Sequence, residues 1–128
     1  MNINDAFTFH IPDRVMDENL LTFCLPDIIE KIKAEDAENG SRNAITLMKN
    51  SNMRIVLIIL HAGAEMNFHE CSNTISVQVI EGEISFQTHN QSIHLTTGAL
   101  LSCHEEYHHT LTAVEETVLL LTIAIGRK

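Results

Sequence analysis

The sequence predicts an all-β domain, a sandwich or barrel of the jelly-roll kind, preceded by an N-terminal arm and one short helix. Three observations support this fold class. From Asn43 onward apolar and polar residues alternate with a period of two, which is typical of strands that bury one face. Turn-forming residues recur about every 8 to 12 residues in the same region. No helical pattern interrupts this region, so the strands must pack against one another, as they do in jelly rolls.

The part of the chain before the barrel, residues 1–43, divides into an arm and a helix. The arm shows no steady period. A helix is predicted over about 26–38, because proline suits the first helical position and an Asn-Gly pair can end a helix with a left-handed residue. Three isoleucines form one apolar stripe along it: Ile28, Ile29 and Ile32. We expect this short acidic helix to cover part of the barrel domain, residues 44–128.

Eight strands are predicted in the barrel domain. Their ranges are 44–49, 53–61, 74–81, 83–88, 91–95, 99–103, 108–114 and 117–125. Turn-forming residues between them indicate hairpins that join consecutive strands. These turn segments are 49–52, Glu81-Gly82, His89-Asn90 and Glu115-Glu116.

Alternation indicates which side chains point inward. In the predicted strand 74–81, Ile75 and Val77 share one face and Gln78 lies on the other. Two strands, 53–61 and 117–125, are apolar on both faces. Such a strand is either sandwiched within the domain or covered by another subunit. We expect the second arrangement, a homodimer formed through these two strands.

The charge balance argues against nucleic-acid and membrane partners. The 128 residues include 17 acidic and 8 basic side chains, for a net charge of −9, and no run of basic residues. Binding to phosphates or anionic lipids depends on clustered lysine and arginine. The longest apolar run, residues 55–60, is too short to span a bilayer. Three irregularly spaced cysteines do not form a disulfide framework, and no stretch resembles a signal peptide, so we expect a reduced, cytoplasmic protein.

Two segments combine glycines and histidines at fixed spacing. Residues 63–82 read GAEMNFHECSNTISVQVIEG, and residues 98–113 read GALLSCHEEYHHTLTA. They resemble the two motifs of the cupin superfamily, G-x5-H-x-H-x3,4-E-x6-G and G-x5-P-x-G-x2-H-x3-N. The matching positions are Gly63, His69, Gly82, Gly98 and His109. The resemblance covers roughly residues 44 to 125 and is greatest to small "cupin 2 conserved barrel" proteins. It implies a double-stranded β-helix, often dimeric, with any metal or ligand inside the barrel.

The chain departs from these motifs at several positions. Cys71 replaces the second histidine of the first motif, and Ile75 replaces its glutamate. In the second motif, three other positions differ: His104, Glu106 and Ala113 replace the proline, a glycine and the asparagine. Of the four metal ligands that the resemblance implies, His69 and His109 remain, with Cys71 as a candidate third.

The alternation of apolar and polar residues predicts that the side chains of His69, Cys71 and His109 all point into the barrel. His69 and Cys71 have the same parity as Ile75 and Val77, and His109 has the parity of inward residues in its own strand. A His2Cys set with an open position suits zinc, iron or copper. Alternatively, the histidines hydrogen-bond within a metal-free pocket and the cysteine packs as a small apolar residue. The cofactor is therefore either none or one divalent transition metal among Zn, Fe, Mn, Ni and Cu.

The candidate ligand pocket comprises His69, Cys71, Ile75, Val77 and His109, and the catalytic residues are not assigned. His104 and Tyr107 are secondary candidates near the barrel mouth, where either could donate a proton. The favoured function is binding of a small molecule without catalysis. The alternatives are a metal-dependent oxygenase or isomerase that acts on a small organic substrate, and a non-catalytic structural or interaction module.

Overall fold

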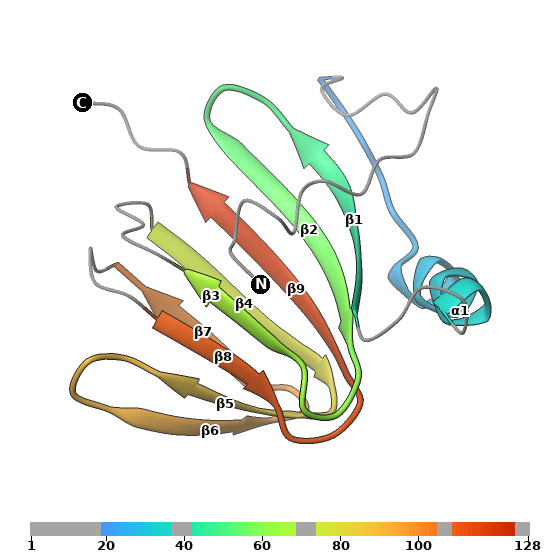
Figure 1. Cartoon of the computed structure of the whole chain (residues 1–128). Helices are drawn as coiled ribbons and strands as arrows, with labels where there is room; N and C mark the ends of the chain where they lie inside the picture. Colours follow the sequence, from blue (N-terminus) through green and yellow to red (C-terminus); the bar gives the residue numbers. More distant parts are fainter. Residues whose placement is uncertain (1–18, 37–41, 69–73, 105–108, 125–128) are drawn as a thin grey trace.

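A computed structural model of the chain describes residues 19–36, 42–68, 74–104 and 109–124, and these ranges contain one helix and nine strands. The elements are α1 (Leu25–Asp36), β1 (Arg42–Lys49), β2 (Met53–Leu60), β3 (Glu65–Phe68), β4 (Thr74–Glu81), β5 (Glu83–Gln87), β6 (Ser92–Thr96), β7 (Leu100–Cys103), β8 (His109–Ala113) and β9 (Thr117–Ala124). The predicted all-β jelly-roll architecture is confirmed (Figure 1).

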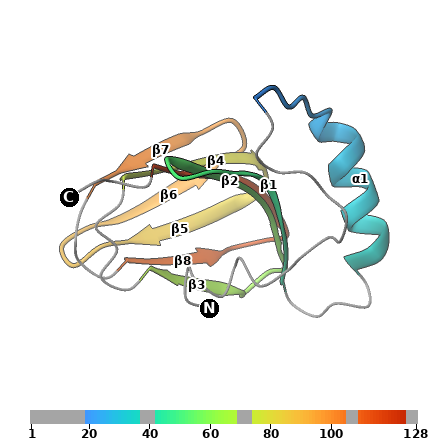
Figure 2. The same ribbon diagram turned by 90° about the horizontal axis from the view of Figure 1, so that it is seen from above.

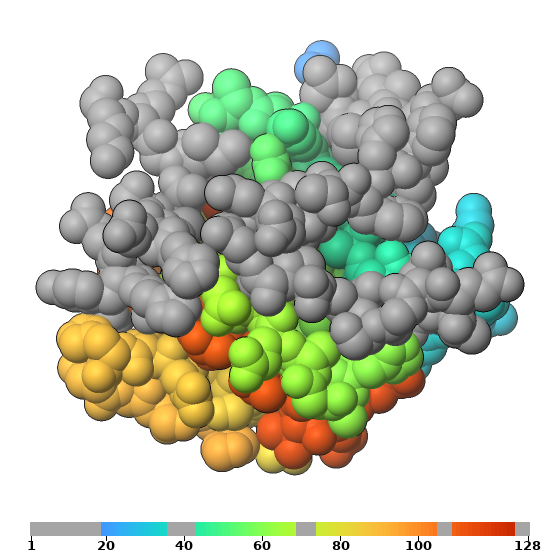
Figure 3. Space-filling model, viewed as in Figure 1, coloured from blue at the N-terminus to red at the C-terminus, as the bar shows by residue number. Residues whose placement is uncertain are grey.

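The strands form two sheets that face each other. One sheet has the order β1-β2-β9-β4-β7, and the other has the order β3-β8-β5-β6. All of their pairings are antiparallel. On the face shown in Figure 3, side chains of β3, of the β5–β6 hairpin and of the orange-red β8–β9 part of the chain form the lower surface. A single core lies between the two sheets.

Alternation along each strand fills this core with apolar side chains. In β4, Ile75, Val77 and Val79 are buried and the residues between them are more exposed, as the sequence predicted. The same cluster takes Val56 and Ile58 from β2, Phe86 from β5 and Leu121 from β9. The interior is thus a continuous apolar core to which both sheets contribute.

A second apolar cluster lies outside the barrel and explains the strands that are apolar on both faces. Leu57 and Ile59 of β2 and Val118 of β9 are buried on the outer face against Ile29 and Ile32 of α1. Figure 2 shows α1 beside β1 and β2, outside the two sheets. The cover predicted to come from a second subunit is therefore supplied in large part by the chain's own helix, because its isoleucine stripe matches this face.

The structure corrects three details of the predicted strand arrangement. β3 (Glu65–Phe68) was not predicted, because four residues are too few to show a period. The turn at Glu81-Gly82 does not form a hairpin, since β4 and β5 belong to different sheets. The same is true of Glu115-Glu116, which joins β8 to β9 across the sheets. The predicted hairpins between β1 and β2 and between β5 and β6 are confirmed.

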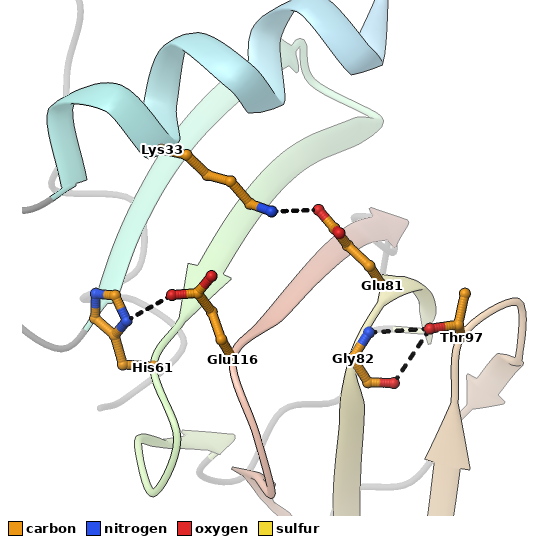
Figure 4. A network of polar contacts seen from close by, with 6 residues as sticks. All are labelled: Lys33, His61, Glu81, Gly82, Thr97 and Glu116. Atoms are coloured by element: carbon orange, nitrogen blue, oxygen red, sulfur yellow. Dashed lines mark hydrogen bonds and ion pairs between the residues drawn. The ribbon is translucent and has the colours of Figure 1, made fainter.

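The two crossings meet at one end of the barrel. Gly82 has a φ of +109°, and an added Cβ there would lie 2.5 Å from Thr117 Oγ1. The buried Thr117 hydroxyl donates to the carbonyl of Glu115 (2.8 Å) and accepts from the amide of Glu83 (3.2 Å). This end also carries three exposed contacts: Lys33 with Glu81, His61 with Glu116, and the Gly82 amide with Thr97 (Figure 4). Glycine is required here because the two crossing segments touch.

Within the described ranges, the structure contains no helix with the length and apolar character needed to span a bilayer.

Candidate functional site

Of the residues predicted for the site, His109 is the polar one that the structure shows to be buried. It opens β8 at the end of the barrel opposite the two crossings, where it pairs with Phe68 of β3. Its side chain is only 2% exposed, and its ring centroid lies 5.7 Å from that of Phe86. The inward orientation predicted for His109 is confirmed by this burial.

Cys103 is the partner of this imidazole. It closes β7 and pairs with Ile75 of β4, so it belongs to the sheet opposite His109. Cys103 Sγ lies 3.5 Å from His109 Nε2, within hydrogen-bonding range for sulfur. The contact therefore joins the two sheets at this end of the barrel.

Cys103 was not among the residues predicted for the site, although the sequence contains a signal for it. Cys103 has the parity of Leu101, and both residues pack against the inner core from the edge strand β7. An inward-facing residue at the end of one strand can contact an inward-facing residue at the start of the following strand. Cys71 was predicted as the sulfur donor instead, because the cupin motif has a metal ligand at that position.

The second nitrogen of His109 has no partner among the described residues. Nδ1 is buried and makes no hydrogen bond there. Leaving such a group unsatisfied costs about 1–3 kcal/mol. If the Cys103 thiol donates to Nε2, Nδ1 carries the ring proton and is a donor without an acceptor; the other tautomer leaves an acceptor without a donor. With either tautomer, Nδ1 of His109 is a buried polar atom without a hydrogen-bond partner among the described residues.

The predicted lining residues of β4 face inward. Ile75 is 3% exposed and Val77 is 1% exposed, and both lie in the inner core cluster. Ile75 stands where the cupin motif has its glutamate, and it packs among apolar side chains. This position supplies no metal ligand in this chain.

Three predicted residues, His69, Cys71 and Tyr107, lie outside the described residues. The described neighbours of 69–73, Phe68 and Thr74, both lie at the His109 end of the barrel. Inward residues are even-numbered in β3 and odd-numbered in β4. The alternation of β4 therefore does not by itself fix which way His69 and Cys71 point, and their inward placement stays a prediction.

His104 is exposed, and its Nδ1 lies 2.6 Å from Thr74 Oγ1. This contact ties the start of β4 to the residue that follows β7. It gives His104 a position at the same end of the barrel, at the surface rather than in the core.

Arg54 adds a positive charge to this end. It has the parity of the inward residues Val56 and Ile58, and it lies in one row with Ile123, Ile75 and Cys103 across the five-stranded sheet. Burial lowers the pKa of the Arg54 guanidinium from its usual value. The guanidinium nevertheless stays charged at neutral pH.

The described donors fit part of a metal site. An imidazole and a thiol are suitable ligands for zinc and similar ions, but catalytic zinc sites use three protein ligands. Within residues 19–36, 42–68, 74–104 and 109–124, no group of three or more His, Cys, Asp or Glu side chains could hold a metal ion. His109 and Cys103 therefore supply two donors, and the four-ligand cupin set is not reproduced because of Ile75.

Comparisons of the whole structure find cupin folds. A cupin superfamily protein from Desulfitobacterium hafniense matches with a TM-score of 0.70 and 17% identity, covering 88% of this chain and 100% of that one. The cupin_2 domain of an XRE family transcriptional regulator from Enterobacter cloacae matches with a TM-score of 0.60 and 18% identity, over 68% and 99% of the two chains. A salicylate 1,2-dioxygenase from Pseudaminobacter salicylatoxidans has a TM-score of 0.61 and 18% identity, over 75% and 31%.

By sequence, no family model and no curated protein matches the chain. The resemblance to cupins predicted from the two motifs is confirmed at the level of fold: the chain folds as a cupin barrel. Because proteins with this fold include both an enzyme and a regulator, the fold does not decide the role.

Proposed function

We propose that this cupin barrel binds a small organic molecule at its His109 end. The observation that carries the proposal is the buried Nδ1 of His109, which has no hydrogen-bond partner among the described residues. Buried polar atoms in folded proteins nearly always have a partner, and those without one often face a ligand or a water. A bound molecule would supply that partner.

The surroundings favour a ligand with a carboxylate or carbonyl oxygen. With the thiol of Cys103 donating to Nε2, the proton on Nδ1 is available to such an oxygen. Arg54 places a positive charge at the same end, although the whole chain carries a net charge of −9. The apolar side chains of Phe86 and Ile75 suit an apolar body on the same molecule.

The test uses chelator-treated protein and three probe carboxylates: acetate, benzoate and salicylate. We expect an aromatic carboxylate to raise the melting temperature and to shift the imidazole nitrogen resonances of His109 in NMR spectra. At 100 times its Kd a ligand stabilises the folded state by about 2.7 kcal/mol. His109→Gln should abolish both effects.

His94→Gln is the matched control, because His94 is an exposed histidine of β6. It should leave both effects unchanged. If no probe shifts the His109 resonances, or if His109→Gln binds as well as the parent chain, the proposal is wrong.

We also propose that the protein is cytoplasmic and forms a homodimer without a nucleic-acid partner. The acidic balance and the absence of basic runs support the exclusion of nucleic acid. Cys24 and Cys103 are not in disulfides, which is consistent with a reducing compartment. Because α1 covers much of β2 and β9, a dimer through these strands would use their other end, near the exposed Met53. Sedimentation equilibrium measures the oligomeric state, and a monomer would contradict the dimer.

A further inference from the structure

Cys103 and His109 form a thiol–imidazole pair that joins the two sheets. Cys103 Sγ lies 3.5 Å from His109 Nε2, close enough for the thiol proton to pass to the ring. A base at hydrogen-bonding distance activates a cysteine as a nucleophile, because the thiolate attacks and the thiol does not. The pair therefore contains the two groups that nucleophilic chemistry of a cysteine requires.

The two side chains differ in exposure in the way that a reactive cysteine needs. Cys103 is half-buried on the edge strand β7, and it is not in a disulfide. His109 is only 2% exposed, so solvent has little access to its ring. Reactive cysteines are partly exposed beside a base, whereas structural cysteines are buried and inert. A small molecule can thus reach Cys103 while the imidazole stays shielded from water.

We propose that Cys103 is a nucleophile that adds to small α,β-unsaturated carbonyl compounds, with His109 as its base. Nε2 takes the thiol proton as the sulfur forms a bond to the β-carbon of the double bond. The electron pair of the double bond moves toward the carbonyl oxygen and gives an enolate. The same proton then passes from Nε2 to the α-carbon, and the product is a thioether. No group departs and there is no net oxidation or reduction, so the addition needs no further reactant.

The surroundings of the pair favour an electrophile with an apolar body. Cys103 pairs with Ile75, whose side chain is 3% exposed, and it packs against the inner core cluster. The ring centroid of His109 lies 5.7 Å from that of Phe86. Apolar walls with few polar groups suit an uncharged organic molecule better than a strongly hydrated one such as hydrogen peroxide. The inference goes beyond the proposed ligand binding and does not rest on it.

The structure also separates His109 from the histidine next to Cys103 in the sequence. Cys103 closes β7 and His109 opens β8, and each is paired with a residue of the strand beside it. His104, which follows Cys103, is exposed, and its Nδ1 lies 2.6 Å from Thr74 Oγ1. Because that imidazole contacts Thr74 at the surface, the base of the pair is His109, and His104 provides a matched control.

Labelling of the reduced, chelator-treated full chain with N-ethylmaleimide, an α,β-unsaturated dicarbonyl, tests the proposal. Cleavage after glutamate places Cys24, Cys71 and Cys103 in the separate peptides 19–30, 71–81 and 84–105, so mass spectrometry follows each thiol. We expect Cys103 to react about tenfold faster than the exposed Cys24 or more, because a general base contributes about 10²–10⁴-fold. His109→Gln should lower the Cys103 rate about tenfold or more and leave the Cys24 rate unchanged. His104→Gln should change neither rate.

A measurement on the unmutated chain covers the case in which His109→Gln does not fold. The ratio of the Cys103 rate to the Cys24 rate should be about one in urea and about ten or more in the folded chain. A ratio that does not rise on folding, or a Cys103 rate that a folded His109→Gln leaves unchanged, overturns the proposal and leaves an S–H to nitrogen hydrogen bond. A lower Cys103 rate in His104→Gln assigns the base to His104 and also overturns it. The labelling uses no carboxylate and the carboxylate test above uses no electrophile, so failure of one proposal can be told from failure of the other.

Discussion

Replacing Gly82 with alanine tests whether the close contact between the two sheet crossings holds the barrel together. The added Cβ would lie 2.5 Å from Thr117 Oγ1, 2.6 Å from the Glu116 carbonyl oxygen and 2.7 Å from Thr117 Cα. Two of these three atoms belong to the backbone, so a rotation of the Thr117 side chain cannot relieve the clash. The backbone itself must move, and the hydrogen bonds of the Thr117 hydroxyl move with it.

Two contributions set the magnitude of the effect. A non-glycine residue at positive φ costs about 1–2 kcal/mol. Overpacking of a tight contact costs a further 1–3 kcal/mol, roughly. We therefore expect Gly82→Ala to lower the free energy of unfolding by about 2–5 kcal/mol, a large part of the 5–15 kcal/mol typical of a folded domain.

Gly98→Ala separates the two contributions. Gly98 has a φ of +90°, close to that of Gly82, but a Cβ there would meet no atom within 4 Å. It should therefore cost only the backbone part, about 1–2 kcal/mol. The excess for Gly82 measures the contact between the crossing segments.

Urea unfolding followed by far-ultraviolet circular dichroism provides the assay, because the chain has no tryptophan and one tyrosine. With an m-value of about 1–3 kcal/mol per molar, an excess of about 2 kcal/mol moves the midpoint by roughly 1 M. Equal midpoints for the two variants would refute the contact argument. Rescue of Gly82→Ala by Thr117→Ala would refute the claim that backbone atoms block the side chain.

Three further predictions concern the outer cluster, the buried hydroxyl and the site. Ile32→Ala should lower the free energy of unfolding by about 2–4 kcal/mol because it opens the contact between α1 and the sheet, whereas Lys31→Ala, on the exposed face of α1, should change it by less than about 0.5 kcal/mol. Thr117→Val should cost about 1–3 kcal/mol because the Glu83 amide loses its acceptor, and Thr122→Val in the same strand should cost less in the same urea assay. In chelator-treated protein without ligand, His109→Phe should keep stability within about 1 kcal/mol, because a polar atom without a partner is removed, whereas His109→Ala should cost about 2–5 kcal/mol through the cavity it leaves. A large loss in His109→Phe would show that polar contacts of the imidazole, the one with Cys103 included, stabilise the fold.

Which residues enter the core could be predicted from the sequence, because alternation depends only on the two-residue period of a strand. Ile75, Val77 and His109 are buried as this rule requires, and Gln78 is exposed. The rule does not extend across the connection between two strands. Inward residues are even-numbered in β3 and odd-numbered in β4, and the sequence of the connection does not reveal this change. The inward placement of His69 and Cys71 was inferred across that connection, and it stays a prediction.

The cover on β2 and β9 shows a second limit. An apolar outer face on a strand predicts that another element covers it. From the sequence, that element could be the helix with its isoleucine stripe or a second subunit. The structure places Ile29 and Ile32 of α1 on this face. Side-chain periodicity reports the need for burial, but the identity of the covering element depends on the path of the chain.

By itself, the sequence determined the strands, their inward faces and the glycine–histidine frame of a cupin barrel, because each of these depends on neighbours within a few residues. The pairing of β4 with β7 and β9, the passage of the chain between sheets at Gly82, and the meeting of Cys103 with His109 were decided only by the tertiary structure. These contacts join residues on different strands or in different sheets. Only the folded backbone brings them within reach of one another, since local chemistry specifies a strand but not the strand beside it.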